Sequence, residues 1–229
     1  MAKYWWGSDD SFPMKILFLA ILLGGFAVGI ALSMTEPSGP AISAGVSLAS
    51  VKLSVLATLA YYFVYYQAIG AQVMVRMALG NDLPATSNTA TRSLNNTLEQ
   101  MPLFLVLLWL YTIYGDATIG GVLGFLYAGL TLLYLFAYAS YGHFTVNCEF
   151  CTQPRYTILT FFALELLCLC FGGSYYTVLP KNVVLLGLWM FVQENLWMNV
   201  CWLVFGVPIA LINNRANPKP PQDAKGAMM

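Results

Sequence analysis

One stretch of the chain carries a cation, an amide and a carboxylate on a single predicted helical face. Asn96 lies four residues after Arg92, and Glu99 lies three residues after Asn96, so their side chains point along one side of a helix. Within a membrane span such groups usually mark a site unless they pair or reach water. Two phenols, Tyr134 and Tyr138, also lie four residues apart and approach the same membrane face. These five side chains predict a polar cleft between helices.

A simpler interpretation of the same stretch is an interfacial arginine that extends to the lipid headgroups, with Glu99 as its partner. Glu99 lies about two helical turns inside the predicted span, where an unpaired carboxylate is expensive. That depth favours a site, although the spacing alone leaves both interpretations open.

The elements that must position these side chains are predicted to be membrane-spanning helices. Hydrophobic residues make up 59% of the 229 residues and charged residues only 9%, whereas a soluble domain carries about 25% charged residues. The formal net charge is zero and the chain has no basic cluster, which argues against a nucleic-acid partner. The sequence therefore predicts an all-α, polytopic protein in a lipid bilayer.

Apolar runs of about 20 residues predict six membrane spans. They cover approximately residues 14–34, 47–79, 92–114, 118–142, 156–176 and 180–212. The predicted organisation is an N-terminal segment with one extra span (1–46), a four-helix core (47–178), and a C-terminal segment with another extra span and a polar tail (179–229). The last span is expected to begin at Pro180, because proline is favourable in a first helical turn.

The charges between the spans predict their orientation. Of the ten lysines and arginines, all but Lys52 and Lys181 fall on one side of the six-span arrangement. Such an excess marks the cytosolic or matrix side, so both termini are expected there, in an endoplasmic reticulum or mitochondrial membrane. The first span is expected to be a membrane helix rather than a cleaved signal sequence, since Asp9 and Asp10 dilute the positive charge before it.

The spacing Arg-x3-Asn-x2-Glu-x2-Pro, formed by Arg92, Asn96, Glu99 and Pro102, resembles the signature of the MAPEG family, the membrane-associated proteins of eicosanoid and glutathione metabolism. The apolar run after Pro102 and the tyrosine-bearing segment 132–139 continue the similarity. The resemblance implies a homotrimer of four-helix bundles that binds glutathione between subunits. It also implies a glutathione-dependent transferase or peroxidase that acts on lipophilic electrophiles.

The resemblance further implies a role for each polar residue. The residues expected to bind substrate are Arg76, Arg92, Asn96, Glu99 and Tyr138. Arg155 and Tyr134 are expected to be catalytic. A free thiol has a pKa of about 8.5, and a fixed guanidinium in a partly dry site favours the thiolate nucleophile.

Three features depart from the family pattern. Family enzymes commonly carry an arginine three residues before the first tyrosine, where this chain has Thr131. The loop before Arg155 is longer than usual, and the extra spans could block the trimer surface. These departures favour an alternative function: a non-catalytic accessory subunit of a larger membrane complex, such as a respiratory one.

The predicted loop before the fifth span contains His143, Cys148 and Cys151. Zinc requires four ligands, and this loop supplies at most three unless Glu149 or a partner contributes, so no metal site is predicted. The Cys-x2-Cys spacing also fits a disulfide or redox pair, and ordinary loop residues are the third interpretation.

Two carboxylates, Glu165 and Glu194, fall inside predicted spans. Polar side chains join helices inside membranes through hydrogen bonds, and we expect that use here. A proton or solute transporter is the alternative that such residues leave open.

Overall fold

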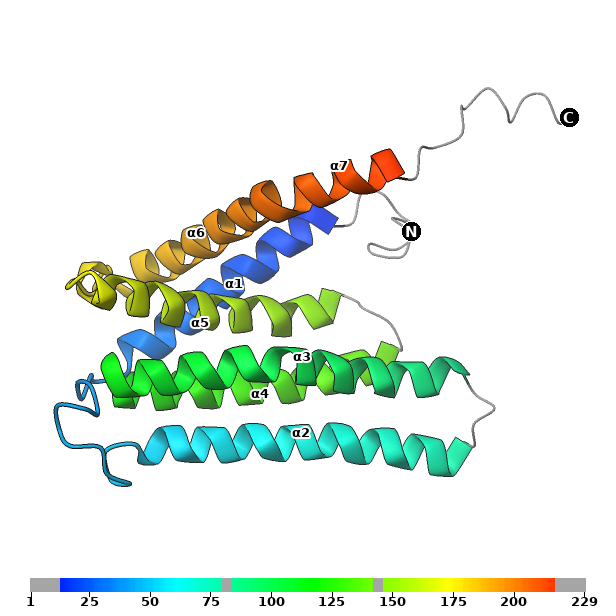
Figure 1. Cartoon of the computed structure of the whole chain (residues 1–229), viewed down its shortest axis with the longest axis horizontal. Coiled ribbons are helices and arrows are strands. Elements are labelled where there is room, and N and C mark those ends of the chain that lie inside the picture. The colour runs from blue at the N-terminus through cyan, green and yellow to red at the C-terminus, as the bar shows by residue number, and fades with distance from the viewer. Residues whose placement is uncertain (1–12, 80–83, 142–145, 217–229) are drawn as a thin grey trace, which may run out of the picture. The chain divides into compact units, whose positions relative to one another are not determined.

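The computed structural model describes residues 13–79, 84–141 and 146–216, and every regular element in these ranges is a helix (Figure 1). The predicted all-α class is therefore confirmed. Five helices are long and apolar enough to cross a membrane, so the chain is a polytopic membrane protein. It divides into two compact units, residues 1–194 and 195–229, and each is described by itself.

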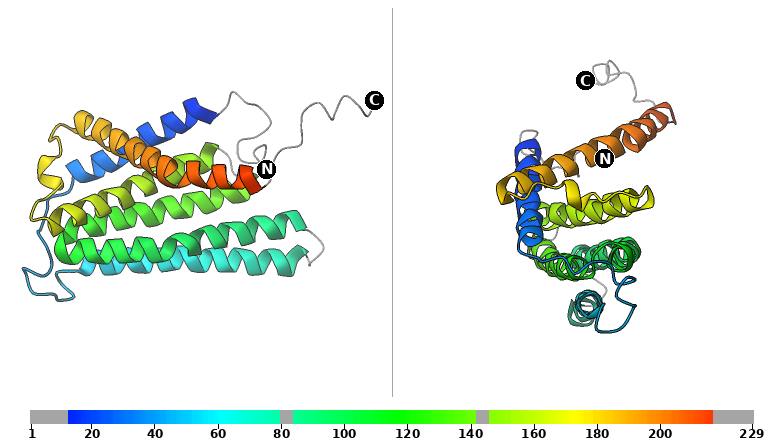
Figure 2. Two further views of the ribbon diagram at one scale, coloured as in Figure 1. Left: turned by 45° about the horizontal axis from the view of Figure 1, so that its top comes forward. Right: turned by 90° about the vertical axis from the view of Figure 1, so that its left-hand side faces the viewer.

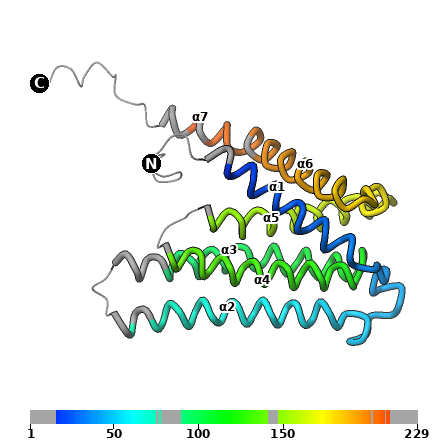
Figure 3. The backbone as a smooth tube through the Cα atoms, turned by 180° about the vertical axis from the view of Figure 1, so that it is seen from behind, coloured from blue at the N-terminus to red at the C-terminus, as the bar shows by residue number. Residues whose placement is uncertain are grey.

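Four long antiparallel helices form the core of the first unit (Figures 1 and 2). They are α2 (Lys52–Leu79), α3 (Pro84–Tyr114), α4 (Ala117–Tyr141) and α5 (Val146–Cys170). α2 packs against α3 and α4, and α5 packs against the same two helices from another side. The C-terminal ends of α2 and α4 lie at the same end of the core as the N-terminal ends of α3 and α5 (Figure 3).

Stacked aromatic rings fill the centre of this core. The ring of Phe104 on α3 stacks on Tyr127 of α4, with centroids 4.0 Å apart and planes 5° from parallel. Tyr61 of α2 lies 4.8 Å from Phe104, and all three side chains are buried. Tyr61 donates a hydrogen bond of 2.9 Å to the carbonyl of Thr97, which satisfies its buried hydroxyl.

A strap formed by residues 35–50 joins the first helix to the core. Asp116 lies in the tight turn between α3 and α4, and its carboxylate accepts a hydrogen bond of 2.8 Å from the backbone N–H of Ile119, as an N-cap does. The other carboxylate oxygen accepts a hydrogen bond from the N–H of Gly39 in the strap. Gly39 has a φ of +82°, a conformation that favours glycine.

Small residues bring the added helices close to the core. In α1 (Pro13–Ser33) Gly24 lies against Pro154 of α5. Gly25 faces the first half of α6 (Val183–Cys201), where an added Cβ would lie 2.7 Å from the backbone nitrogen of Phe191 and 2.8 Å from the carbonyl oxygen of Gly187. Such close approach of helix backbones is typical of small-residue interfaces in membranes.

The two carboxylates inside the predicted spans make hydrogen bonds. Thr160 of α5 donates a hydrogen bond of 3.1 Å to Glu194 of α6, so the expected bond between helices is confirmed there. Glu165 accepts from the hydroxyl of Ser174 at 2.7 Å and from the N–H of Tyr176 at 2.6 Å. It therefore fixes the turn after α5 rather than a second helix.

The second unit continues α6 into a π-helical turn, η3 (Trp202–Gly206), and then into α7 (Val207–Ala216). Pro208 lacks a backbone N–H, so a regular α-helical hydrogen bond cannot form there, and π-helical turns accommodate such breaks. The span predicted over residues 180–212 is confirmed as a candidate membrane span over Val183–Ile209, although its helix is not a regular α-helix throughout. The predicted start at Pro180 is wrong, because Asn182 caps α6 by accepting hydrogen bonds of 2.9 Å from Val184 and 3.2 Å from Leu185.

The polar loop predicted before residue 156 is wrong over most of its length. α5 already begins at Val146, and Glu149 accepts a hydrogen bond of 2.6 Å from Gln153 one turn later. Pro154 lies inside the helix, where its ring rests against α1. The charged residues of α5 make it less apolar than the five helices that qualify as spans. The start of α3 also differs, since it begins at Pro84 rather than near residue 92.

Candidate functional site

The centre of the candidate site is the side chain of Arg155, which is fully buried. Its guanidinium carbon lies 4.8 Å from the ring centre of Tyr134 and 5.8 Å from that of Tyr127. One terminal nitrogen donates to the hydroxyl of Thr131 at 3.4 Å, and the other donates to Thr152 at 3.3 Å. The site thus lies between α4 and α5, at the end where α4 finishes and α5 begins.

Arg155 has no anionic partner within the described part of the chain. The salt bridge found there joins Arg92 to Glu99, and the Nε of Arg155 is buried without a hydrogen-bond partner. A buried charge without a counter-ion is costly, and stacking on aromatic rings offsets only about 2 kcal/mol of that cost. The geometry therefore provides a pre-formed cation that lacks an anion.

The two tyrosines predicted to line the site lie together, as their spacing requires. The rings of Tyr134 and Tyr138 are 5.7 Å apart, and Tyr134 is buried while Tyr138 is partly buried. Cys148 and Cys151 of α5 pack against Tyr134. Tyr134 also lies within electrostatic range of the guanidiniums on α3 and α5.

The predicted face of α3 exists, but its charged residues also pair with each other. Arg92 and Glu99 are 3.7 Å apart, and their side chains are 57% and 61% exposed. Such an exposed pair contributes little to stability, and it agrees with the simpler interpretation in which Glu99 is the partner of Arg92. Between them, Oδ1 of Asn96 is buried and has no hydrogen-bond partner in the described structure. One turn earlier, the buried hydroxyl of Ser93 also lacks one.

A glutamine that the sequence analysis missed connects three helices beside this cluster. Gln100 of α3 accepts a hydrogen bond of 2.9 Å from the hydroxyl of Tyr127 on α4 and donates one of 3.4 Å to the hydroxyl of Tyr156 on α5. Its position four residues after Asn96, on the same helical face, was the available signal. Thr152 gave no such signal, because threonine is common in membrane helices.

Two residues that the sequence analysis named cannot be placed at the site: the side chain of Arg76 in α2 and the whole of His143 lie outside the described residues. Cys148 and Cys151 pack against Tyr134 but form no disulfide. Among the described residues no group of three or more metal-ligating side chains forms.

The arrangement of four core helices with this polar cluster agrees with a family comparison. A model of the MAPEG family matches residues 46–172, more than half of the chain. The chain belongs to the MAPEG family. The MAPEG match covers α2 to α5 and all seven predicted site residues, whereas α1 and α6 lie outside it. The chain matches no curated protein and no solved structure.

The structure explains the main departure of this MAPEG chain at Thr131. The hydroxyl of Thr131 accepts a hydrogen bond from Arg155, so a guanidinium lies beside position 131 although it comes from α5 instead of α4. Tyr134 therefore still has a cation beside it, which is Arg155 itself.

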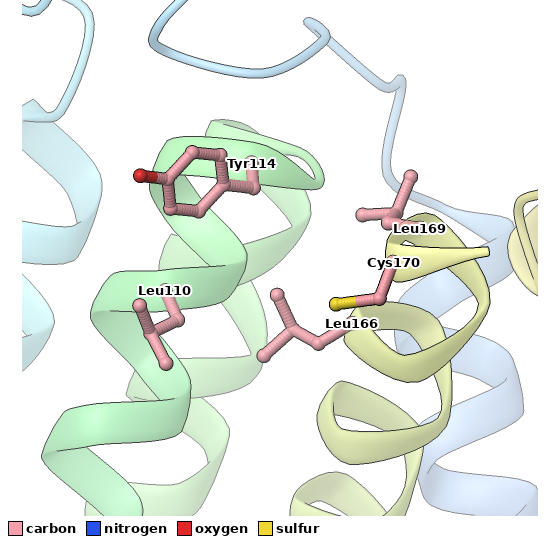
Figure 4. Close-up of a pocket in the computed structure, with 5 residues that line it drawn as sticks. All are labelled: Leu110, Tyr114, Leu166, Leu169 and Cys170. Atoms are coloured by element: carbon pink, nitrogen blue, oxygen red, sulfur yellow. The ribbon is translucent and has the colours of Figure 1, made fainter. Parts of the chain in front are cut away.

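A separate apolar groove lies at the opposite end of α3 and α5 (Figure 4). It has a volume of about 330 Å³ and is lined by Leu110, Tyr114, Leu166, Leu169 and Cys170. The sulfur of Cys170 points into the space between the two helices. None of the predicted site residues lines it, so the groove is not part of the Arg155 cluster.

Proposed function

We propose that this MAPEG protein binds glutathione at the polar cluster of α3, α4 and α5 and acts as a glutathione-dependent transferase or peroxidase on lipophilic substrates from the bilayer. The observation that supports this proposal most strongly is the buried guanidinium of Arg155, which has no carboxylate partner among the described residues. An anionic group of a ligand would supply the missing counter-charge.

The unpartnered polar atoms of the cluster fit the chemistry of a short peptide. Nε of Arg155 is a hydrogen-bond donor, and Oδ1 of Asn96 is an acceptor. The hydroxyl of Ser93 can act as either. Glutathione carries carboxylates that accept from a guanidinium, and amide and ammonium groups that donate to an amide oxygen. One molecule therefore offers complementary partners to donors and acceptors alike.

The proposed chemistry follows from the charge of Arg155. A guanidinium held next to a thiol stabilises the thiolate, whose sulfur is the reactive nucleophile. In a transfer reaction the sulfur forms a bond to an electrophilic carbon, and the negative charge passes to the leaving group or to the adduct. Tyr134, whose ring lies against Arg155, would donate a hydrogen bond to the same anion in this proposal.

Titration calorimetry of glutathione into the purified full-length protein in lipid nanodiscs tests the proposal. Substitutions Arg92→Ala and Arg155→Met are expected to weaken binding, because each removes a cation from the cluster. The matched control is Lys181→Ala, which removes an exposed cation from the turn before α6. Absence of binding by the unmodified protein, or equal binding by all variants, would overturn the proposal.

A second candidate function is a non-catalytic subunit of a larger membrane assembly. The observation that favours it is the packing of α1 on α5, where Gly24 meets Pro154, because this added helix covers part of the core that the family site would use. Native electrophoresis of gently solubilised membranes separates the two candidates. Co-migration of the whole population with a larger complex, together with absence of glutathione binding, would favour the subunit.

A further inference from the structure

Two cysteines beside the candidate site have no role in the proposed transferase chemistry. Cys148 and Cys151 lie on α5 and form no disulfide, and their exposed fractions are 0% and 8%. Residues three apart lie on the same face of a helix, and both pack in one cluster with Tyr134. The two sulfurs therefore belong to one local environment, unlike Cys168 and Cys170, which are two residues apart and face away from each other.

The local helix allows these two side chains to approach. Helical residues three apart have Cβ atoms about 5–6 Å apart, whereas a disulfide requires about 3.5–4.5 Å. In a 3₁₀ turn, which is common at helix ends, side chains three residues apart lie directly above one another. Tightening of the first turn of α5 to this geometry would bring the two sulfurs closer together. Cys148 is the third residue of α5, and Pro154 removes one hydrogen bond from the following turn. Closure of a disulfide therefore requires the first turn of α5 to tighten.

The charges around the pair favour reaction at Cys151. Burial raises the pKa of the Cys151 thiol, whereas the Arg155 guanidinium one turn later acts in the opposite direction. Cys151 is the more exposed of the two cysteines, so it is the thiol that a small molecule reaches first. Exchange is expected to be slower than at a fully exposed thiol.

We propose that Cys148 and Cys151 form a redox-active dithiol that exchanges with low-molecular-weight organic disulfides. The Cys151 thiolate attacks one sulfur of the small disulfide, which forms a mixed disulfide and releases one small thiolate. The Cys148 thiolate then attacks the Cys151 sulfur, which closes the protein disulfide and releases the second small thiolate. The protein loses two electrons and two protons, and these appear in the two small thiols. This exchange does not depend on the proposed transferase function.

Redox titration of the full-length protein in nanodiscs tests this proposal. The protein is equilibrated with glutathione buffers of increasing disulfide content, and in parallel with 2-hydroxyethyl disulfide and its thiol, which share no peptide groups with glutathione. After acid quenching and alkylation, mass spectrometry counts the free thiols. The expected result with both probes is reversible loss of two thiols, mapped to one peptide that joins Cys148 to Cys151.

The control variant replaces Cys168, Cys170 and Cys201 by alanine, and it is expected to give the same two-thiol change. Cys148→Ala is expected to stop at a mixed disulfide on Cys151. The denatured protein is the positive control, because it should form the disulfide in the buffer with the highest disulfide content. If the folded protein keeps both thiols open to alkylation in that buffer, the proposal is overturned. Oxidation that maps to Cys168 and Cys170 instead would also overturn it.

Discussion

The two hydroxyls that accept hydrogen bonds from Arg155 would keep a hydrogen bond of their own without it. The hydroxyls of Thr131 and Thr152 accept from its guanidinium. Each hydroxyl also donates its own hydrogen bond to a backbone carbonyl, that of Tyr127 at 2.9 Å and that of Cys148 at 2.7 Å. Removal of the guanidinium thus leaves no hydroxyl donor unsatisfied in this cluster. The charge of Arg155 is costly to bury, and the fold does not require it.

Substitution Arg155→Met is therefore expected to separate stability from ligand binding. Replacement of a buried charge by an apolar side chain of similar length is often neutral or stabilising, so the melting temperature in detergent should stay the same or rise. Glutathione affinity should fall about tenfold or more, since a charge-assisted hydrogen bond contributes about 1.5–3 kcal/mol. Thermal unfolding and calorimetry measure the two effects. A destabilised protein that binds glutathione normally would assign Arg155 a purely structural role.

The contact between Thr131 and Arg155 predicts the effect of moving the arginine to α4. Thr131→Arg places a second guanidinium beside the first, and repulsion between buried like charges should destabilise the protein by about 2–4 kcal/mol. The double substitution Thr131→Arg with Arg155→Thr restores a single cation and should recover most of the lost melting temperature. Equal stability of the single and double variants would show that the two positions do not share one site.

The sequence predicted the local part of this site and missed the part that depends on packing between helices. The shared face of Arg92 and Glu99 follows from helical periodicity, and their contact confirms it. The contacts of Gln100 and Thr131 depend on how α3, α4 and α5 pack side by side, which spacing along one helix does not determine. The start of α5 was missed because Pro154 and its polar neighbours resemble a loop in composition.

At the scale of elements, the crossing of α1 and α6 depends on glycines that allow the backbones to meet. Gly25→Ala adds a Cβ that lies 2.7 Å from the backbone nitrogen of Phe191 in α6. Such overpacking destabilises a protein by about 1–3 kcal/mol. Gly129→Ala in α4 is the matched control, because no atom lies within 4 Å of its added Cβ, and it should stabilise the helix by up to about 1 kcal/mol. Thermal unfolding should show shifts of opposite sign. A stabilising effect of Gly25→Ala would contradict the close crossing.

The strap between α1 and α2 is expected to depend on Asp116. Asp116→Ala removes both the N-cap of α4 and the hydrogen bond to Gly39, which together should cost about 1–3 kcal/mol. Ser38→Ala on the same strap removes only an exposed hydrogen bond of 3.2 Å to the N–H of Thr118, and it should change stability by less than about 0.5 kcal/mol. Chemical unfolding in micelles compares the two variants, and similar losses from both would argue against the dual role of Asp116.

At the scale of the whole molecule, the polar face of α3 needs a covering surface in the membrane. Arg92 is close to the start of the span Ala90–Tyr114, whereas Glu99 lies about 10 Å further along the helix. A charged side chain at the centre of a bilayer costs about 2.5–3.5 kcal/mol, and the carboxylate of Glu99 is largely exposed in a single chain. Lipid is a poor solvent for this face, so we expect protein to cover it.

We therefore expect this protein to be oligomeric in a bilayer, with a trimer as the form that the family resemblance implies. Native mass spectrometry from nanodiscs measures the number of copies. The double substitution Arg92→Leu with Glu99→Leu removes the need to cover charge and should shift the protein toward single chains, whereas Leu98→Ala on the exposed surface of the same helix should not. Copies of this chain alone would favour the glutathione site, and other subunits would favour the accessory role. A monomeric protein that carries both charges in lipid would contradict both roles, because its largely exposed Glu99 carboxylate would then face hydrocarbon with Arg92 as its partner.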